Sequence, residues 1–207
     1  MPTASGEPWD LPRTFTRGVP HPTLTLMFVS AIATAALGSD NVYCVSMPSK
    51  WSSSHSKSDA KDLARRLKIS FKSIPIENLM TSFEESFIKT ISFEMAEITN
   101  QNIQSRIRGT LLMALANQEK HLLLSTGNKS ELAVGYCTLY GDMNGGLSVI
   151  GDLYKTNVFK LCNWLDSEDS INHRKSYMLD TNVNIIGENI RTKAPSAELG
   201  PDQLDTD

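Results

Sequence analysis

Apolar positions along the chain switch between helical and strand-like spacing, and this pattern predicts the order of the elements. Helices are predicted over 24–37, 59–67, 79–88 and 99–117, with a shorter helix after position 128 and another that begins at 152 or 155 and ends at 165. Strands are predicted over 42–47, 71–76 and 121–125. The last strand holds an unbroken run of leucines, which is typical of a strand buried on both faces of a parallel sheet. Strands that alternate with helices predict an α/β fold with a doubly wound, mostly parallel sheet.

Local signals set the expected ends of these elements. Gly38 follows the first apolar run as a helix C-cap, Ser56-Lys-Ser-Asp59 has the form of a capping box, and Thr99 is a candidate N-cap. Residues 1–22 hold five prolines and no periodicity, so a disordered leader is expected there. We therefore expect one domain over 23–207, in which the polar stretch 166–187 forms a surface insertion.

Composition narrows the class of function. A chain of 207 residues suits one sizeable domain, and a net charge of −3 with a pI near 5.8 gives no electrostatic case for a nucleic-acid ligand. The three cysteines stand far apart without a CxxC pair, which argues against a disulfide framework or a zinc site: Cys44, Cys137 and Cys162. A reducing cytoplasm is the expected setting.

Candidate chemistry follows the leucine strand. In an open parallel sheet, ligands bind outside the carboxyl ends of the strands, and 126–131 occupies such an end. Glu131 could ligate Mg²⁺ together with ATP phosphates, and Lys155 could neutralise phosphate charge. Each residue also has a plain structural interpretation, because a Glu in a first helical turn is favoured by the helix dipole and a Lys opening a helix is usually solvated.

The order and spacing of several motifs carry a resemblance to one family. They are NIQSRIRG at 102–109, HLLLSTGNKSELAVGYCTLYGDMNGGL at 121–147, DLYK at 152–155 and KAPSAEL at 193–199. Over roughly 23–205 the chain resembles the synthetase domain of NAD synthetase, and most closely that of the glutamine-dependent type. The resemblance implies a Rossmann-like fold of the ATP pyrophosphatase (adenine-nucleotide α-hydrolase) kind.

The resemblance also implies roles for individual residues. The residues implied to contact ATP are Thr126, Lys155 and Ser196. The residues implied to bind deamido-NAD are Asn102, Arg106, Arg108, Glu131, Tyr136, Cys137, Thr138, Leu139 and Asp142. Glu131 is also the implied metal ligand, and no catalytic side chain is assigned. The glycines expected to shape the loop around the dinucleotide are Gly141, Gly145 and Gly146, although an ordinary turn would use the same residue types.

The reaction that the resemblance implies is ATP-dependent amidation of deamido-NAD to NAD. It would run through an acyl-adenylate, release AMP and pyrophosphate, and use ATP and Mg²⁺. The nitrogen would come from ammonia or from glutamine-derived ammonia. A homodimer is expected, because the family's dinucleotide site lies at a two-fold interface; no nucleic-acid or membrane partner is expected.

One family motif is missing from the sequence. Where the family has Ser-Gly-Gly-x-Asp-Ser, a pyrophosphate loop, this chain reads Arg-Gly-Val-Pro-His-Pro at 17–22, and Pro20 and Pro22 lack the amide donors that such a loop needs. The core strand before it is expected to be absent, so that the domain is N-terminally incomplete. Three interpretations stay open: a synthetase domain impaired by this loss, a working ammonia-dependent enzyme that completes its site otherwise, or a non-catalytic dinucleotide-binding or dimerisation module.

The first apolar segment has a competing interpretation. Arg13 and Arg17 precede the run over 24–37, which contains Ala-Thr-Ala at 33–35, and this has the outline of a secretory signal. The run is too short to span a bilayer. We favour a buried core helix, because the same segment aligns with a buried helix of the family.

Overall fold

The structure is a computed structural model that describes residues 14–18, 23–91, 95–192 and 199, and over these residues it contains a five-stranded parallel sheet. The strands are β1 (Thr14–Gly18), β2 (Val42–Ser46), β3 (Ser70–Ser73), β4 (Leu122–Ser125) and β5 (Leu147–Ser148). Their order across the sheet is β3-β2-β1-β4-β5, and every neighbouring pair is parallel. The predicted doubly wound, parallel α/β fold is confirmed.

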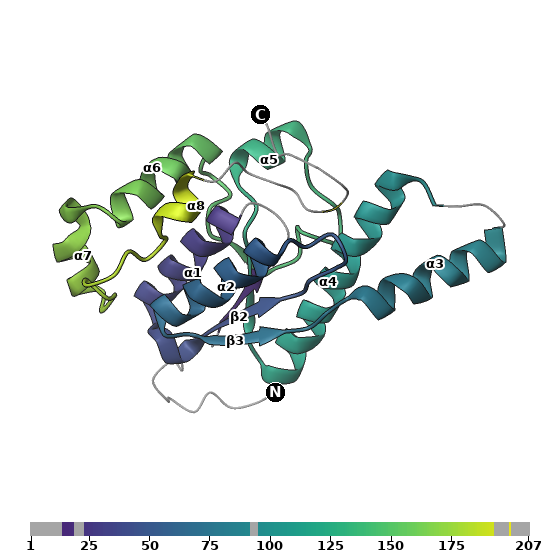
Figure 1. Ribbon diagram of the computed structural model, residues 1–207, viewed down its shortest axis with the longest axis horizontal. Coiled ribbons are helices and arrows are strands. Elements are labelled where there is room, and N and C mark those ends of the chain that lie inside the picture. Colours follow the sequence, from purple (N-terminus) through teal and green to yellow (C-terminus); the bar gives the residue numbers. More distant parts are fainter. Residues whose placement is uncertain (1–13, 19–22, 92–94, 193–198, 200–207) are drawn as a thin grey trace, which may run out of the picture.

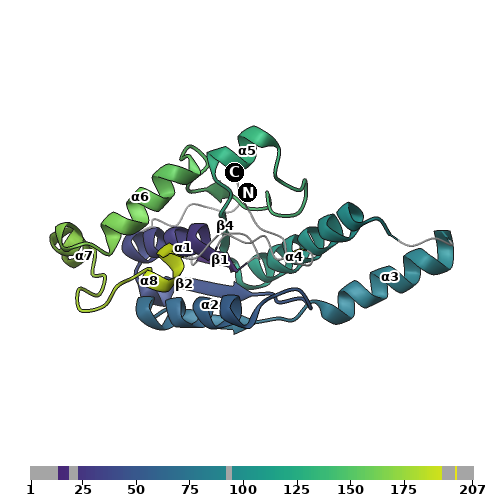
Figure 2. The same ribbon diagram turned by 45° about the horizontal axis from the view of Figure 1, so that its top comes forward.

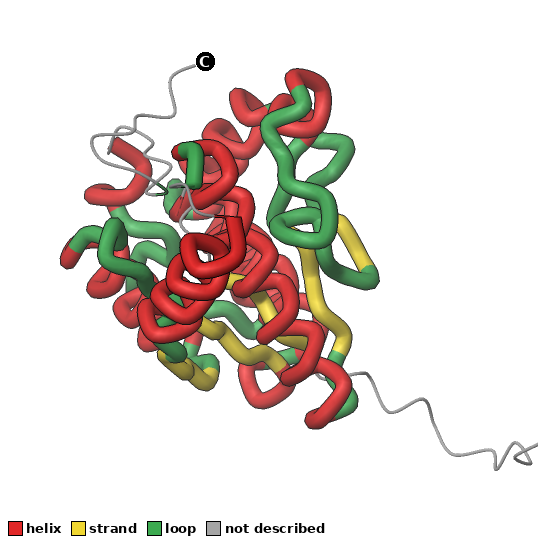
Figure 3. Tube along the Cα trace, turned by 90° about the vertical axis from the view of Figure 1, so that its right-hand side faces the viewer, coloured by secondary structure: helices red, strands yellow, loops and turns green. Residues whose placement is uncertain are grey.

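Helices cover both faces of this sheet (Figure 1). They are α1 (Thr23–Leu37), α2 (Ser54–Leu67), α3 (Glu77–Ile91), α4 (Glu97–Glu119), α5 (Lys129–Val134), α6 (Lys155–Leu165), α7 (Ile171–Ser176) and α8 (Glu188–Thr192). The helices α3 and α4 form a hairpin whose far end projects beyond the sheet, whereas the second half of α4 packs against it (Figure 2). Figure 3 views the molecule from the side of this hairpin, with its helices in front of the strands.

Two hydrophobic clusters form because successive side chains of a strand point to opposite faces. In β4, Leu124 packs in the cluster that contains α1, α2 and α6, whereas Leu123 packs in the cluster that contains α3 and α4. In β2, Cys44 belongs to the first cluster and Val45 to the second. The predicted burial of the leucine strand on both faces is confirmed.

The central strand corrects the sequence analysis. Residues Thr14–Gly18 form β1, which pairs with β2 on one side and with β4 on the other. The prediction of a disordered leader over 1–22 is therefore wrong for these five residues, and so is the prediction that this core strand is absent. The run Thr-Phe-Thr has the β-branched and aromatic side chains that favour strands. It was not predicted as a strand because the surrounding prolines are typical of irregular structure. Positions 1–13 and 19–22 lie outside the described residues.

Two predicted helix starts are also wrong. The N-cap of α2 is Ser53, whose Oγ accepts a hydrogen bond from the Ser56 N–H at 3.1 Å, so the helix begins before the predicted capping box at 56–59. Ala96 occupies the N-cap position of α4 without a side-chain cap, which places Thr99 inside the first turn. Polar residues suited to capping recur within both first turns, so the sequence alone did not single out the true boundary.

The stretch 166–187 is not a purely surface insertion. Asp166, at the end of α6, has a fully buried side chain that accepts hydrogen bonds from the N–H groups of Ile186 (3.0 Å) and Gly187 (2.8 Å). The same carboxylate lies 3.2 Å from Arg191 in α8. Ile186 is fully buried in the α1 cluster, so the stretch folds back against the core. Its few apolar residues follow no period, which is why the sequence pattern indicated a surface segment.

The apolar segment 24–37 is a packed helix, as we favoured. Met27 and Val29 of α1 are fully buried against the sheet. No helix within the described ranges has both the length and the apolar character needed to cross a bilayer.

Candidate functional site

The strand order gives the sheet a switch point between β1 and β4. The chain leaves β1 through α1 toward β2 on one side, whereas β4 lies on the other side of β1. Loops diverge at such a switch point, and open α/β sheets bind ligands there, outside the carboxyl ends of the strands. β4 ends at Ser125, so the residues that follow it line this edge.

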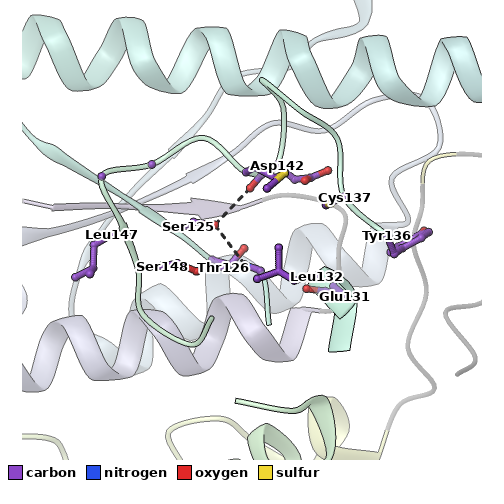
Figure 4. A pocket seen from close by; sticks show the side chains of 13 residues that line it. Ser125, Thr126, Glu131, Leu132, Tyr136, Cys137, Asp142, Leu147 and Ser148 are labelled. Carbon is purple, nitrogen blue, oxygen red and sulfur yellow. Dashed lines mark hydrogen bonds between the residues drawn. The ribbon is translucent and has the colours of Figure 1, made fainter. Parts of the chain in front are cut away.

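A pocket of about 200 Å³ opens at the end of β4 (Figure 4). Its lining comes from the end of β4, from α5, from the loop after α5 and from β5. The lining residues are Ser125, Thr126, Gly127, Glu131, Leu132, Tyr136, Cys137, Asp142, Met143, Gly145, Gly146, Leu147 and Ser148. The pocket therefore joins a polar corner with an apolar wall, which suits an amphipathic organic ligand.

The polar corner is built by a capping box at the start of α5. The Asn128 side chain accepts a hydrogen bond from the Glu131 N–H at 3.1 Å, and Glu131 Oε2 accepts one from the Asn128 N–H at 2.8 Å. Asn128 is fully buried. The reciprocal bonds satisfy two amides of the helix start and hold the Glu131 carboxylate at the pocket rim. Glu131 thus has a structural role in addition to the role implied by resemblance.

The loop over 136–146 folds around the carboxylate of Asp142. The Thr138 N–H donates to both carboxylate oxygens, at 2.8 and 3.1 Å, and Ser105 Oγ of α4 donates to Oδ2 at 3.0 Å. Ser125 Oγ donates to the backbone carbonyl of Asp142 at 3.4 Å. The Asp142 side chain therefore links two parts of the loop to each other and to α4. The backbone carbonyl of Asp142 is held by Ser125 at the end of β4.

Gly145 lets this loop lie directly against β4. Its φ is +149°, and a Cβ at this position would lie 2.9 Å from the Ser125 nitrogen and 3.1 Å from the Leu123 oxygen. The next amide, that of Gly146, donates to the Leu123 carbonyl at 2.8 Å. The predicted shaping of the loop by glycines has this physical basis, because only a residue without a side chain permits such close backbone contact.

Cys137 is a partly exposed thiol in the pocket lining. Burial raises its pKa above the ordinary value of 9.0, and the nearby carboxylates of Asp142 and Glu131 raise it further. Because the thiolate is the reactive form, this cysteine is a protonated lining group at neutral pH and not an activated nucleophile.

The structure brings together five of the residues implied by resemblance. Thr126, Glu131, Tyr136, Cys137 and Asp142 all line the pocket. These residues come from two segments, the end of β4 with α5 and the loop that follows, which the fold returns to the same edge of the sheet.

The residues implied on α4 meet the neighbouring loop. Asn102 Oδ1 accepts a hydrogen bond from Thr138 Oγ1 at 2.8 Å, and Arg106 Nε donates to the Leu139 carbonyl at 3.2 Å. Arg108 is fully buried elsewhere, and its Nε donates to the carbonyl of Met47, just after β2, at 3.0 Å.

The other residues implied to contact ATP are placed differently. Lys155 is buried at the first position of α6, and its N–H donates to Ser130 Oγ at 3.1 Å, which joins α6 to α5. Lys155 is outside the described lining of the pocket. Ser196 lies outside the described residues; three positions further on, Leu199 is buried, and its carbonyl accepts a hydrogen bond from Gln104 Nε2 at 3.0 Å.

The sequence analysis missed two residues that build the site. Asn128 had a usable signal, because Asn followed three residues later by Glu is a capping-box pattern. Ser105 had none, since its partner Asp142 is 37 positions away in the chain.

The described residues do not form a metal cage. In the ranges that the structure covers, no group of three His, Cys, Asp or Glu side chains is arranged to hold a metal ion. Two carboxylates line the pocket, and that of Asp142 already accepts hydrogen bonds from Thr138 and Ser105. The remaining carboxylate, that of Glu131, fits Mg²⁺ only when a nucleotide supplies phosphate oxygens as further ligands.

Comparisons with known proteins agree with the fold and show the family. A family model described as NAD synthase matches residues 26–207. A glutamine-dependent NAD(+) synthetase from Synechocystis sp. is 50% identical over 179 residues, which cover 86% of this chain and 30% of the relative. The chain thus spans about a third of the length of the curated relatives it matches.

Solved structures give the same picture. A glutamine-dependent NAD⁺ synthetase from Acinetobacter baumannii, solved in complex with ADP, superimposes with a TM-score of 0.77 at 37% identity, over 89% of this chain and 32% of that one. An NH₃-dependent NAD synthetase from Campylobacter jejuni superimposes with a TM-score of 0.65 at 27% identity, over 78% of this chain and 66% of that one.

Proposed function

Because the chain belongs to the NAD synthase family, we propose that it binds ATP and deamido-NAD and supports amidation of deamido-NAD to NAD. The observation that carries this proposal is the convergence of Thr126, Glu131, Tyr136, Cys137 and Asp142 on one pocket at the carboxyl end of β4. That the Acinetobacter relative was solved in complex with ADP supports nucleotide binding by this domain.

The proposed chemistry has two steps. The carboxylate of the nicotinate ring is a poor electrophile, so it first attacks the α-phosphate of ATP, which gives an acyl-adenylate and releases pyrophosphate. Ammonia then attacks the acyl carbon and displaces AMP. In this proposal the loop around Asp142 orients the nicotinate and Thr126 contacts the nucleotide, so that positioning and charge compensation provide most of the catalysis. Glu131 would hold Mg²⁺, which supplies positive charge for the departing pyrophosphate.

The nitrogen source and the assembly are part of the proposal. The relatives include glutamine-dependent and NH₃-dependent synthetases, so ammonia, free or derived from glutamine, is the proposed nucleophile. A homodimer is proposed as well, supported by the apolar side chains that the α3–α4 hairpin exposes, such as Phe83, Ile88 and Ile98. All three cysteines carry free thiols, which supports a reducing cytoplasm.

The test is a coupled assay that follows NAD formation from deamido-NAD, ATP, Mg²⁺ and ammonia. Glu131→Gln is the informative variant, because Gln has nearly the same shape and can still accept the capping-box hydrogen bond, whereas it lacks the negative charge. We expect this variant to keep its thermal midpoint and to lose at least about tenfold in rate, as expected when one charge contact that stabilises the transition state is removed. The matched control is Glu119→Gln, an exposed carboxylate at the far end of α4, which should keep the parent rate. A full rate for Glu131→Gln would contradict its proposed role.

A second candidate function has one observation in its favour. The sequence at 17–22 has prolines where the family's pyrophosphate loop needs amide donors. This favours a non-catalytic module that keeps the dinucleotide pocket. Such a module would give heat on titration with deamido-NAD in calorimetry but no NAD in the coupled assay, whereas the first proposal requires both signals.

A further inference from the structure

One face of α4 runs along the loop that lines the pocket. Asn102, Ser105, Arg106 and Gly109 follow the spacing i, i+3, i+4 and i+7, which places them on one side of a helix. Each of them meets the loop over 138–144. The loop is therefore supported along two turns of the helix.

The polar contacts on this face are side-chain hydrogen bonds between α4 and the loop. Thr138 Oγ1 donates to Asn102 Oδ1 at 2.8 Å, and Ser105 Oγ donates to the Asp142 carboxylate at 3.0 Å. Ser105 is buried and Asn102 is half-buried. Removal of either partner would leave a poorly hydrated polar group, so each bond matters more than a solvent-exposed one.

Close backbone packing completes the contact. A Cβ added to Gly109 would lie 2.8 Å from the Gly141 oxygen and 3.0 Å from the Tyr140 oxygen. A Cβ on Gly141 would collide with Ser105. Gly109 on the helix and Gly141 on the loop therefore let the loop backbone pack directly against α4. The separation of loop and helix is fixed by this close contact.

We propose that this face of α4 is a positioning surface for the pocket, and that Asn102 and Ser105 are positioning residues that set the loop before any ligand arrives. The proposal rests on the proposed function for its ligand, since it assigns these residues an effect on deamido-NAD binding through the loop. It differs from a role as direct ligand contacts, because it requires an effect on the ligand-free protein.

Cys137 reports changes in this loop. Its thiol lies next to Thr138 in the chain and lines the pocket, whereas Cys44 and Cys162 are fully buried and are protected in the folded protein. Because the Cys137 thiol is only partly exposed, its alkylation rate by iodoacetamide, followed peptide by peptide in mass spectrometry, rises when the loop shifts and exposes it further.

The experiment compares Asn102→Ala and Ser105→Ala with Thr110→Ala, which removes a hydroxyl from the exposed side of the same helix. Without ligand, we expect Cys137 alkylation to rise by more than about twofold in both variants and to rise more in Ser105→Ala, because a hydrogen bond to a charged group is worth more than one between neutral groups. Thr110→Ala should keep the parent rate, and the other two cysteines should stay protected in all variants. Rates within about twofold of the parent would overturn the proposal, given the same hydrogen-bond energies.

The coupled assay adds a second readout. A loosened loop costs ordering energy on binding, so the KM for deamido-NAD should rise in both variants more than kcat falls. If Asn102→Ala raises KM while the alkylation of Cys137 is unchanged, Asn102 is a direct ligand contact and the positioning role is refuted. If the parent chain forms no NAD, the proposed function fails, and the alkylation rates alone decide on the positioning surface.

Discussion

Gly145→Ala tests whether the pocket loop is held by its close contact with β4. The glycine has a φ of +149°, and its added Cβ would lie 2.9 Å from the Ser125 nitrogen and 3.1 Å from the Leu123 oxygen. Both atoms belong to the backbone of β4, which pairs with β1 on one side and with β5 on the other and cannot move aside. The methyl group must therefore displace the loop.

The expected magnitude has two parts. An alanine held at such a φ costs of the order of 1–3 kcal/mol, and overpacking against a backbone that cannot relax costs about 1–3 kcal/mol more. Gly38→Ala isolates the first part, because Gly38 has a φ of +82° and a Cβ there would meet no atom within 4 Å. We expect losses of about 4 kcal/mol for Gly145→Ala and about 2 kcal/mol for Gly38→Ala.

Urea unfolding followed by far-UV circular dichroism measures both losses, and amide exchange of Gly146 reports whether its hydrogen bond to the Leu123 carbonyl survives. The amide should exchange faster in Gly145→Ala than in Gly38→Ala. Equal losses of free energy in the two variants, with unchanged exchange at Gly146, would refute the reasoning, because the contact with β4 would then contribute nothing.

Three other changes test separate parts of the molecule. Leu112→Ala removes a fully buried side chain of α4 and should cost about 2–5 kcal/mol in urea unfolding; a loss below about 1 kcal/mol would contradict its place in the core. Burial raises the pKa of the Cys137 thiol, so iodoacetamide should react with it slowly at pH 7 and progressively faster as the pH rises past 9.0. A reaction rate that levels off below pH 9.0 would contradict a raised pKa. The hydrogen bond from Arg65 lowers the pKa of Asp62 below 3.8, so this pair stabilises the fold above that pH and the contribution is lost as the pH falls through the lowered pKa. Asp62→Asn should therefore lower the free energy of unfolding slightly at pH 7 and make it less dependent on pH below about pH 4. An unchanged pH dependence in that range would contradict the role of the pair.

The fold was predictable wherever a signal was local. The leucines of β4 indicated a strand buried on both faces, and the apolar run of α1 indicated a core helix. β1 was missed because a five-residue strand between prolines gives little local signal and gains its stability from partners far away in the chain. Asp166 shows the same limit, since the backbone amides that it binds belong to a segment about twenty positions later.

The candidate site divides in a similar way. The resemblance named Thr126, Glu131 and Asp142, and the fold brings them to one pocket. The resemblance gave no hint that Glu131 also closes a capping box, although the spacing of Asn128 and Glu131 has that pattern. That Ser105 holds Asp142 could not be predicted, because the two residues are 37 positions apart in the chain. The role of Ser196 stays a prediction, since it falls outside the described residues.

The place of β1 in the middle of the sheet has a consequence for synthesis on the ribosome. β2 follows β1 closely and can dock on one side at once, but the partner on the other side, β4, is translated only after α4 is complete. Until then one edge of β1 exposes unpaired amides and carbonyls, which is the form of strand that recruits foreign chains into aggregates. The nascent chain should therefore need shielding by a chaperone during this interval, although in the finished protein β4 pairs with Thr14, Phe15 and Thr16 along that edge.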